Sequence, residues 1–144
     1  MTVSLAQPIP SPLKGVTPDH AGAALRWFDT MREKDQWGLS TDEQIQLLGG
    51  VSKRTYQDWK KKALANQPVE LSRDLMERFS LLLGIYKALK IIAPGGRPEV
   101  GVQWFNSPNS NALFNGLSPK EFAIQVGTME ALYAIRRYLD AARG

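Results

Sequence analysis

The feature that most restricts the fold of this chain is a series of helix-start signals along its length. At each signal a serine or threonine precedes an acidic residue, a proline or both, and the signals begin at Thr17, Ser40, Ser72 and Ser118. The hydroxyl group accepts a hydrogen bond from a free amide of the first turn, while proline and acidic residues suit that turn. Because no segment keeps the apolar–polar alternation of a half-buried strand, the sequence predicts an all-α protein with about seven helices.

Glycine and proline residues mark where these helices should end. Interruptions of the helical pattern occur at Gly38, Gly49-Gly50, residues 94–98 and Gly127. Between residue 98 and the helix start at Ser118 we expect only a short segment around Trp104-Phe105 and a polar turn over 106–109. The predicted helices cover residues 17–37, 40–48, 53–62, 72–93, 118–126 and 128–144.

The predicted organisation has three parts. Residues 1–16 contain three prolines among small residues, a composition that buries too little apolar surface to offset the entropy of ordering, so we expect a flexible tail. The run 94–98 should bend the chain and separate residues 17–94 from residues 95–144. A length of 144 residues, with 43% hydrophobic and 22% charged residues, is otherwise ordinary for a globular protein.

Composition excludes several kinds of chemistry. The chain has no cysteine and a single histidine, His20, so it holds no disulfide, no thiolate nucleophile and no Cys- or His-rich metal site. His20 lies in the predicted first turn of a helix, where a surface or capping role is far more common than a general-base role. Because no acid–base or nucleophile constellation is visible, we expect neither an enzyme nor a bound cofactor.

Hydropathy and charge suggest where the protein works. No run reaches the roughly 18 apolar residues of a membrane span, and residues 1–12 lack the basic start and apolar core of a secretory signal. We therefore expect a cytoplasmic protein with no membrane partner. The net charge of +4 suits an anionic partner, provided that the positive charge is concentrated in one place.

The most specific motif lies between Ile45 and Trp59. A helix-turn-helix needs a glycine where the turn becomes left-handed, an apolar residue just after it, and apolar residues that fix the second helix to the first. Gly50, Val51, Tyr56 and Trp59 occupy these places. The motif predicts a DNA-binding helix-turn-helix whose second helix starts after Ser52.

The opposite face of that second helix presents groups that can contact DNA. Lys53 and Arg54 can donate to guanine, Gln57 can pair with adenine, and neighbouring hydroxyls can bond to phosphate. Residues 53–62 carry five basic side chains and one acidic side chain, an excess equal to the net charge of the whole chain. The predicted DNA-binding residues are Ser52, Lys53, Arg54, Thr55, Gln57, Lys60, Lys61 and Lys62.

A less specific interpretation of this segment stays open. Any amphipathic helix after a glycine turn can bury an aromatic pair, and three lysines can simply form a solvated face. Two residues also depart from the usual helix-turn-helix pattern, because Gln46 stands where alanine is common and Gly49 where leucine is common. These departures predict looser packing between the two helices, or a different register.

The helix predicted over residues 72–93 has two apolar stripes. One contains Leu75, Phe79, Leu82, Leu83 and Tyr86, and the other contains Leu81, Ile85, Ala88 and Ile92. A single neighbouring core would leave one stripe exposed, so this helix must be central or lie at a dimer interface. Since few other apolar elements remain to cover both, we expect a homodimer with Leu81 and Ile85 at its interface.

The C-terminal third resembles a known antitoxin family. Trp104-Phe105 is followed by a Pro-Asn turn at Pro108-Asn109, by the helix start Gly116-Leu117-Ser118-Pro119 and by a closing helical pair. This order resembles the toxin-binding domain of the MbcA/ParS/Xre antitoxins, whose N-terminal half carries an Xre-like helix-turn-helix. Together with the motif at 45–59, the resemblance covers about residues 17–144.

The resemblance implies a function and partners. Antitoxins of this family pair with a RES-domain toxin, which degrades NAD or transfers ADP-ribose, and block its active site with their C-terminal end. Many also dimerise and bind operator DNA to repress their own transcription. Residues 17–94 would then hold the helix-turn-helix and dimerisation region, and residues 95–144 the toxin-binding domain. The toxin-facing residues carried over by position are Arg136, Arg137, Tyr138, Asp140, Arg143 and Gly144.

Other interpretations of these features stay open. The three arginines near the C-terminus would also complement the negative end of a helix dipole without any partner. The alternative function is a stand-alone helix-turn-helix transcription regulator that has no toxin. A further alternative is a pure interaction module whose helix-turn-helix no longer binds DNA.

Overall fold

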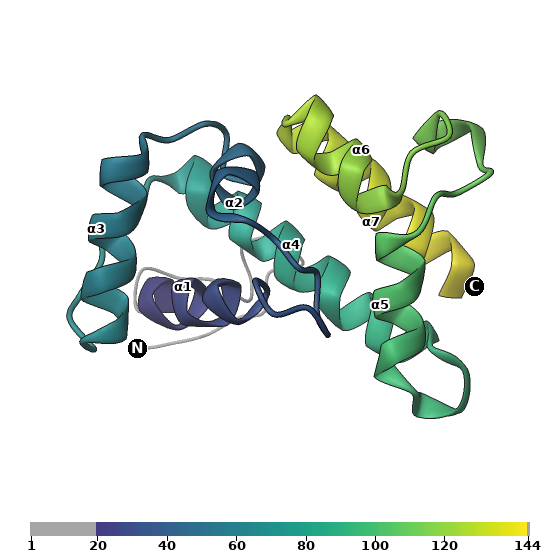
Figure 1. Ribbon diagram of the computed structural model, residues 1–144, viewed down its shortest axis with the longest axis horizontal. Coiled ribbons are helices and arrows are strands. Elements are labelled where there is room, and N and C mark those ends of the chain that lie inside the picture. The colour runs from purple at the N-terminus through teal and green to yellow at the C-terminus, as the bar shows by residue number, and fades with distance from the viewer. Residues whose placement is uncertain (1–19, 144) are drawn as a thin grey trace, which may run out of the picture.

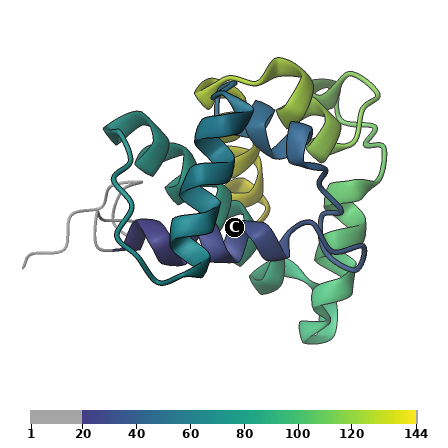
Figure 2. The same cartoon turned by 60° about the vertical axis from the view of Figure 1, so that its left-hand side comes forward.

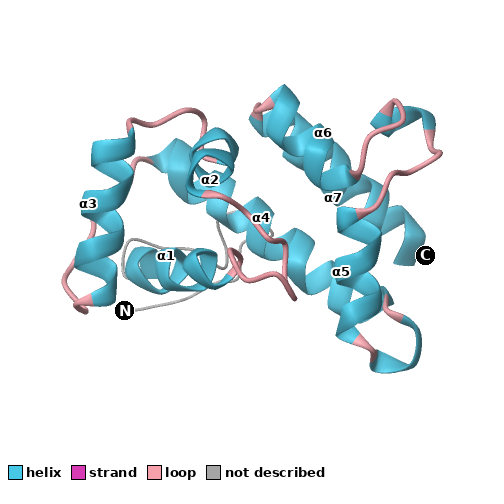
Figure 3. Ribbon diagram, viewed as in Figure 1, coloured by secondary structure: helices cyan, strands magenta, loops and turns pink. Residues whose placement is uncertain are grey.

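The structure of the chain is a computed structural model that describes residues 20–143. The described part contains helices, turns and loops but no strand, which confirms the all-α prediction (Figure 3). Its α-helices are α1 (Ala21–Thr30), α2 (Thr41–Leu47), α3 (Lys53–Leu64), α4 (Arg73–Ile92), α5 (Pro98–Asn106), α6 (Pro119–Val126) and α7 (Met129–Arg143). Two short 3-10 turns, η3 (Pro94–Gly96) and η4 (Ala112–Phe114), lie on either side of α5.

The predicted helix starts are confirmed wherever they fall within residues 20–143. Ser40 and Glu43 form a reciprocal capping box, with N–H···O distances of 3.1 and 2.9 Å. Ser72 caps α4, and Ser118 forms a second capping box in front of α6. The signal at residues 17–19 and the tail predicted over 1–16 lie outside the described residues. These caps satisfy first-turn amides that would otherwise lack an intrahelical partner.

The structure differs from the expected helices at two places. Helix α1 ends at Thr30 and not at residue 37, and α5 forms where only a short segment around Trp104 is predicted. Pro98 occupies the first turn of α5, a position that proline tolerates because the missing N–H has no helical partner there. Pro98 closes the run 94–98 that interrupts the helical pattern, and it also begins α5. Gly101 lets α5 approach α4 closely, since a Cβ at this position would lie 2.8 Å from the carbonyl oxygen of Leu89.

Helix α4 passes through the middle of the molecule, with α1 to α3 on one side and α5 to α7 on the other (Figure 1). Its most extensive contacts are with α7, followed by α5 and α1. Leu81 and Ile85 are 3% and 0% exposed in the single chain. The prediction that these residues form a dimer interface is therefore wrong, because both are already buried within the single chain.

Aromatic side chains connect the parts of the chain on either side of residue 94. The contact that crosses residue 94 is between Trp37 and Phe105, whose ring centroids lie 4.4 Å apart. Before residue 94, Tyr86 contacts both Trp27 and Trp37 edge-on. Core residues from both parts belong to one cluster. The boundary predicted at residue 94 thus lies between segments that share a core.

None of the helices described is long and apolar enough to cross a membrane.

Candidate nucleic-acid interface

The turn between α2 and α3 has the left-handed backbone that the sequence predicts. Gly49 and Gly50 have φ values of +92° and +84°, which favour glycine because a side chain would be strained there. The amide of Gly50 donates to the carbonyl oxygen of Ile45 at 2.9 Å. Ser52 then caps α3 by accepting a hydrogen bond from the amide of Thr55 at 3.1 Å, and its hydroxyl also bonds to the Thr55 hydroxyl.

Helix α3 is fixed to the core by one face and by polar contacts from α1. Tyr56 and Ala63 are fully buried. Arg26 of α1 donates to the carbonyl oxygen of Ala63 at 2.8 Å, near the C-terminal end of α3. Lys60 forms an ion pair with Asp29 of α1 at 3.2 Å, and its side chain is only 17% exposed. One predicted DNA-binding residue, Lys60, is therefore turned toward α1.

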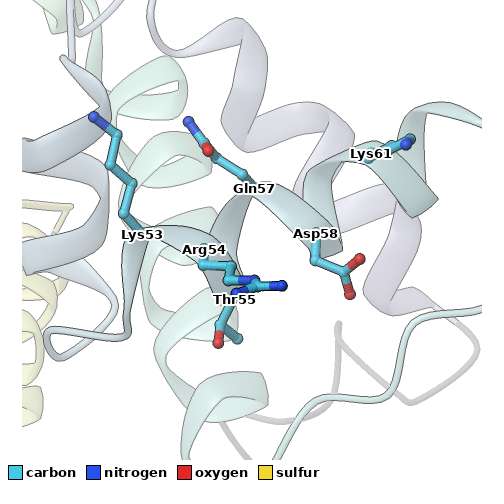
Figure 4. A pocket seen from close by; sticks show the side chains of 6 residues that line it. All are labelled: Lys53, Arg54, Thr55, Gln57, Asp58 and Lys61. Atoms are coloured by element: carbon cyan, nitrogen blue, oxygen red, sulfur yellow. The ribbon is translucent and has the colours of Figure 1, made fainter.

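The opposite face of α3 is exposed and polar. Figure 2 shows α3 at the front of the molecule, and Figure 4 shows the side chains that leave this helix toward an open depression. The residues lining the depression are Lys53, Arg54, Thr55, Gln57, Asp58 and Lys61. Five of the eight predicted DNA-binding residues are thus brought together on one surface.

The remaining predicted residues have local partners. Ser52 is exposed at the start of α3, where its hydroxyl is used for capping. Lys62 forms an ion pair with Asp58 at 3.3 Å, one turn away on the same helix, and both side chains are about half exposed. An exposed pair of this kind contributes little to stability and exchanges readily for another anion. Lys62 therefore remains able to reach a phosphate near the edge of the depression.

The chemistry of this surface suits a polyanion that carries hydrogen-bonding groups. A guanidinium, two ammonium groups and a side-chain amide lie on one helical face, where they can contact phosphates and base edges. Across residues 20–143, no group of three or more His, Asp or Glu side chains is placed to hold a metal ion. The surface offers recognition by charge and hydrogen bonding.

The two departures from the helix-turn-helix pattern have structural explanations. Gln46 is exposed, so alanine is not needed at that position. A buried position on α2 is occupied by Gln44, whose Nε2 donates to the carbonyl oxygen of Phe28 at 2.7 Å. At Gly49 the guanidinium of Arg78 fills the space that a side chain would occupy, 3.1 Å from an ideal Cβ. These two residues thus join α2 to α1 and the turn to α4.

Sequence reasoning did not single out Arg78 and Gln44. Burial lowers the pKa of the Arg78 guanidinium below its usual value, and the carboxylate of Asp74 partly offsets this effect. Both residues stand one turn from core leucines, Gln44 from Leu47 and Arg78 from Leu75. A polar residue beside an apolar stripe is the signal that could have identified them.

The predicted toxin-facing residues of α7 have unequal surroundings. The Arg136 side chain lies over Gly84 of α4 and also pairs with Asp140 at 3.3 Å. The ring of Tyr138 stacks on Trp104, with centroids 5.7 Å apart. Arg137, Asp140 and Arg143 are exposed, whereas Gly144 lies outside the described residues. Only part of the predicted set is therefore accessible to a partner.

Tyr56 anchors α3 but leaves a polar atom in the core. Its side chain is 0% exposed, and its hydroxyl has no hydrogen-bond partner among the described residues. Burial raises the pKa of Tyr56, and the carboxylate of Asp29 raises it further. A buried hydroxyl without a partner is destabilising, so the ring, and not the hydroxyl, holds α3 in place.

We expect Tyr56→Phe to leave Tm at neutral pH unchanged or to raise the free energy of unfolding by up to about 1 kcal/mol. The folded-state pKa of Tyr56 lies above that of the unfolded chain, which is about 10. The contribution of the Tyr56 proton to the free energy of unfolding is therefore fully present below pH 10 and decreases as the pH rises above 10. Thermal unfolding at pH 7 and at pH 10.5 should show a smaller alkaline loss in Tyr56→Phe than in the wild type. A clear loss of Tm at pH 7 would contradict this view of the hydroxyl.

Comparison with known proteins agrees with the geometry of this surface. Residues 14–84 match the family model of the antitoxin Xre-like helix-turn-helix domain. The chain is also 36% identical over 135 residues to the uncharacterized protein y4oB of Sinorhizobium fredii (strain NBRC 101917 / NGR234), an alignment that covers 92% of this chain and 97% of that protein. The chain therefore belongs to the same family as y4oB, and its residues 14–84 match the antitoxin Xre-like helix-turn-helix domain.

Proposed function

We propose that this chain is the antitoxin of a type II toxin–antitoxin system, acting in the cytoplasm as a homodimer and having no enzymatic activity of its own. It neutralises a RES-domain toxin, which degrades NAD or transfers ADP-ribose, and it binds operator DNA to control its own transcription. The single observation that carries the DNA-binding part is the exposed, basic and polar face of α3 directly after a left-handed glycine turn.

The DNA-binding role follows from the position of α3. Its inner face is buried through Tyr56, and its outer face presents Lys53, Arg54, Gln57 and Lys61. The width of the major groove admits a helix that presents such groups, with arginine or lysine directed to guanine and glutamine to adenine. A duplex carrying the promoter of this gene should be retarded in a gel shift, and the affinity should fall steeply as salt concentration rises.

Arg54 and Lys61 should respond differently to replacement by alanine. We expect Arg54→Ala to weaken operator binding by about 1–3 kcal/mol and to relax sequence preference, because its guanidinium is suited to bidentate contact with guanine. Lys61→Ala should weaken binding to all sequences alike and reduce the salt slope by about one. Titrations against operator and mixed-sequence duplexes at several salt concentrations measure both effects. If Arg54→Ala lowered the affinity for both duplexes equally, a role of Arg54 in recognising bases would be contradicted.

The toxin-binding role is supported by the match to the antitoxin Xre-like helix-turn-helix domain and by the resemblance in the C-terminal third. Arg137 and Arg143 are exposed cations of α7, and an acidic surface on the toxin would attract them. Arg136 and Tyr138 instead support the helix from the side of the core. Co-expression with the adjoining reading frame, followed by co-purification and mass measurement, tests both the toxin partner and the homodimer.

The second candidate function is a stand-alone transcription regulator. The observation in its favour is that the match to the antitoxin family model ends at residue 84 and leaves α5, α6 and α7 outside it. A regulator of this kind would bind its promoter, but the product of the adjoining reading frame would not co-purify with it. Protection of cells against the product of the adjoining frame distinguishes the antitoxin from this alternative.

A further inference from the structure

Arg78 lies at a junction between the helix-turn-helix and the C-terminal helices. It projects from the first half of α4, and a single nitrogen, Nη1, donates two hydrogen bonds. One goes to the carbonyl oxygen of Leu47 at 3.1 Å, and the other to the carbonyl oxygen of Gly127 at 3.2 Å. Leu47 is the last residue of α2, and Gly127 is the C-cap of α6. Arg78 thus joins the ends of two helices that are far apart in the sequence.

The electrostatics of this junction favour a cation. The last carbonyl groups of a helix lack intrahelical partners and carry the negative end of the helix dipole. Two such ends, those of α2 and α6, converge on one guanidinium that is only partly exposed. Arginine suits this place because its charge is permanent and its donors have fixed directions. Replacing it by an apolar side chain would leave both carbonyls without their partner.

The same side chain sets the geometry of the turn that leads into α3. The Cζ, Nε and Nη2 atoms of Arg78 lie 3.1 to 3.2 Å from the position of a Cβ at Gly49. Gly49 and Gly50 are the left-handed residues that redirect the chain from α2 into α3. Contact with the guanidinium therefore restricts where this turn can lie, and with it where α3 begins.

We propose that Arg78 is a positioning residue that ties the orientation of the helix-turn-helix to the α6–α7 junction, so that a partner which moves α6 or α7 changes the DNA selectivity of α3. This inference rests on the proposed DNA-binding function. Arg78 itself belongs to α4 and lies outside the set of side chains that line the depression on α3. Its effect on DNA recognition would act through the Gly49-Gly50 turn.

The test measures selectivity, defined as the ratio of Kd for a mixed-sequence duplex to Kd for a duplex of the chain's own promoter. Both are measured by fluorescence anisotropy at one salt concentration and well below Tm. We expect Arg78→Met to lower selectivity about tenfold or more, through loss of base contacts, while the salt slope stays unchanged. Arg78→Lys keeps the positive charge but lacks the planar guanidinium with its fixed donors, so its selectivity should lie between those of Arg78→Met and the wild type.

Two further variants separate positioning from general destabilisation. Ile135→Val trims a fully buried side chain of α7, and it should lower Tm without changing selectivity. Gly127→Ala strains the α6–α7 junction, where φ is +69°. This change should reduce selectivity in the wild-type background but have little further effect together with Arg78→Met, because the connection is already broken.

The possible results distinguish the inference from the function on which it rests. Selectivity that is unchanged in both Arg78→Met and Arg78→Lys, despite a lower Tm, would overturn the positioning role and leave DNA binding intact. Additive effects of Arg78→Met and Gly127→Ala would overturn the connection to the α6–α7 junction. A wild-type chain with no preference for its own promoter would overturn the proposed DNA-binding function and this inference with it.

Discussion

Replacing Ile85 with glutamate should unfold the protein instead of separating two copies of it. Ile85 is 0% exposed at the centre of α4, and Leu82 and Leu89 on the same helix are buried as well. A carboxylate at this site would lose its hydration without gaining a partner. The expected cost is on the order of 5 kcal/mol, which is comparable to the whole stability of a small domain. Circular dichroism and thermal unfolding would show the loss of the folded state.

The same helix offers a matched control. Ile91 is 60% exposed, so Ile91→Glu should change the free energy of unfolding by no more than about 0.5 kcal/mol. Both variants convert isoleucine to glutamate in the second half of α4, and they differ mainly in burial. A folded, monomeric Ile85→Glu chain with an unchanged Tm would contradict the buried position and restore the case for a dimer interface on α4.

Removal of residues 141–144 should abolish or strongly weaken protection against the proposed toxin while the fold and DNA binding persist. Ala141, Ala142 and Arg143 are exposed, and Leu139 is the last buried residue of α7. The deletion therefore removes no described core contact. Cell survival is measured with truncated and full-length chains expressed at matched levels together with the toxin. Thermal unfolding and a gel shift confirm that the truncated chain is folded.

Charge reversal gives a finer version of this experiment. Arg143→Glu should reproduce part of the loss if this arginine meets an acidic surface of the toxin, because attraction to that surface becomes repulsion. Arg73→Glu is the control, since Arg73 is an exposed basic residue of the first turn of α4. Full protection by the truncated chain would mean that the proposed neutralisation uses another surface of the protein.

Local signals in the sequence were sufficient for most of the helices. Capping residues act within one turn of the residues that they cap, so Ser40, Ser72 and Ser118 could be recognised without knowing the fold. The left-handed turn at Gly50 and the outward face of α3 are equally local, because helical periodicity decides which residues share a face. The run 94–98 was interpreted only as an interruption, although Pro98 at its end also suits the first turn of a helix and begins α5.

Features that depend on contacts across the chain could not be predicted in this way. Lys60 resembles its neighbouring lysines in sequence, but its ion pair with Asp29 turns it toward α1 and away from the exposed depression on α3. Helix α4 is covered by α1 on one side, through contacts such as Phe28 with Phe79, and by α5 and α7 on the other. Periodicity carries no information on whether the covering helices belong to the same chain. The junction at Arg78 joins residues 31 and 49 positions away. Such pairings are set by tertiary packing.

The central position of α4 also bears on how relatives of this protein can diverge. The family match ends at residue 84, within α4, which runs from Arg73 to Ile92. Recombination between two relatives at that point would produce a hybrid α4, with its first half from one protein and its second half from the other. Helices α1 to α3 and α5 to α7 would then both have to pack against this hybrid helix. Changes in binding preference are therefore easier by point substitution on the exposed faces of α3 and α7 than by exchange of halves between relatives. Mutations accepted on one side of α4 would constrain those accepted on the other side, so the two halves of the chain should evolve together.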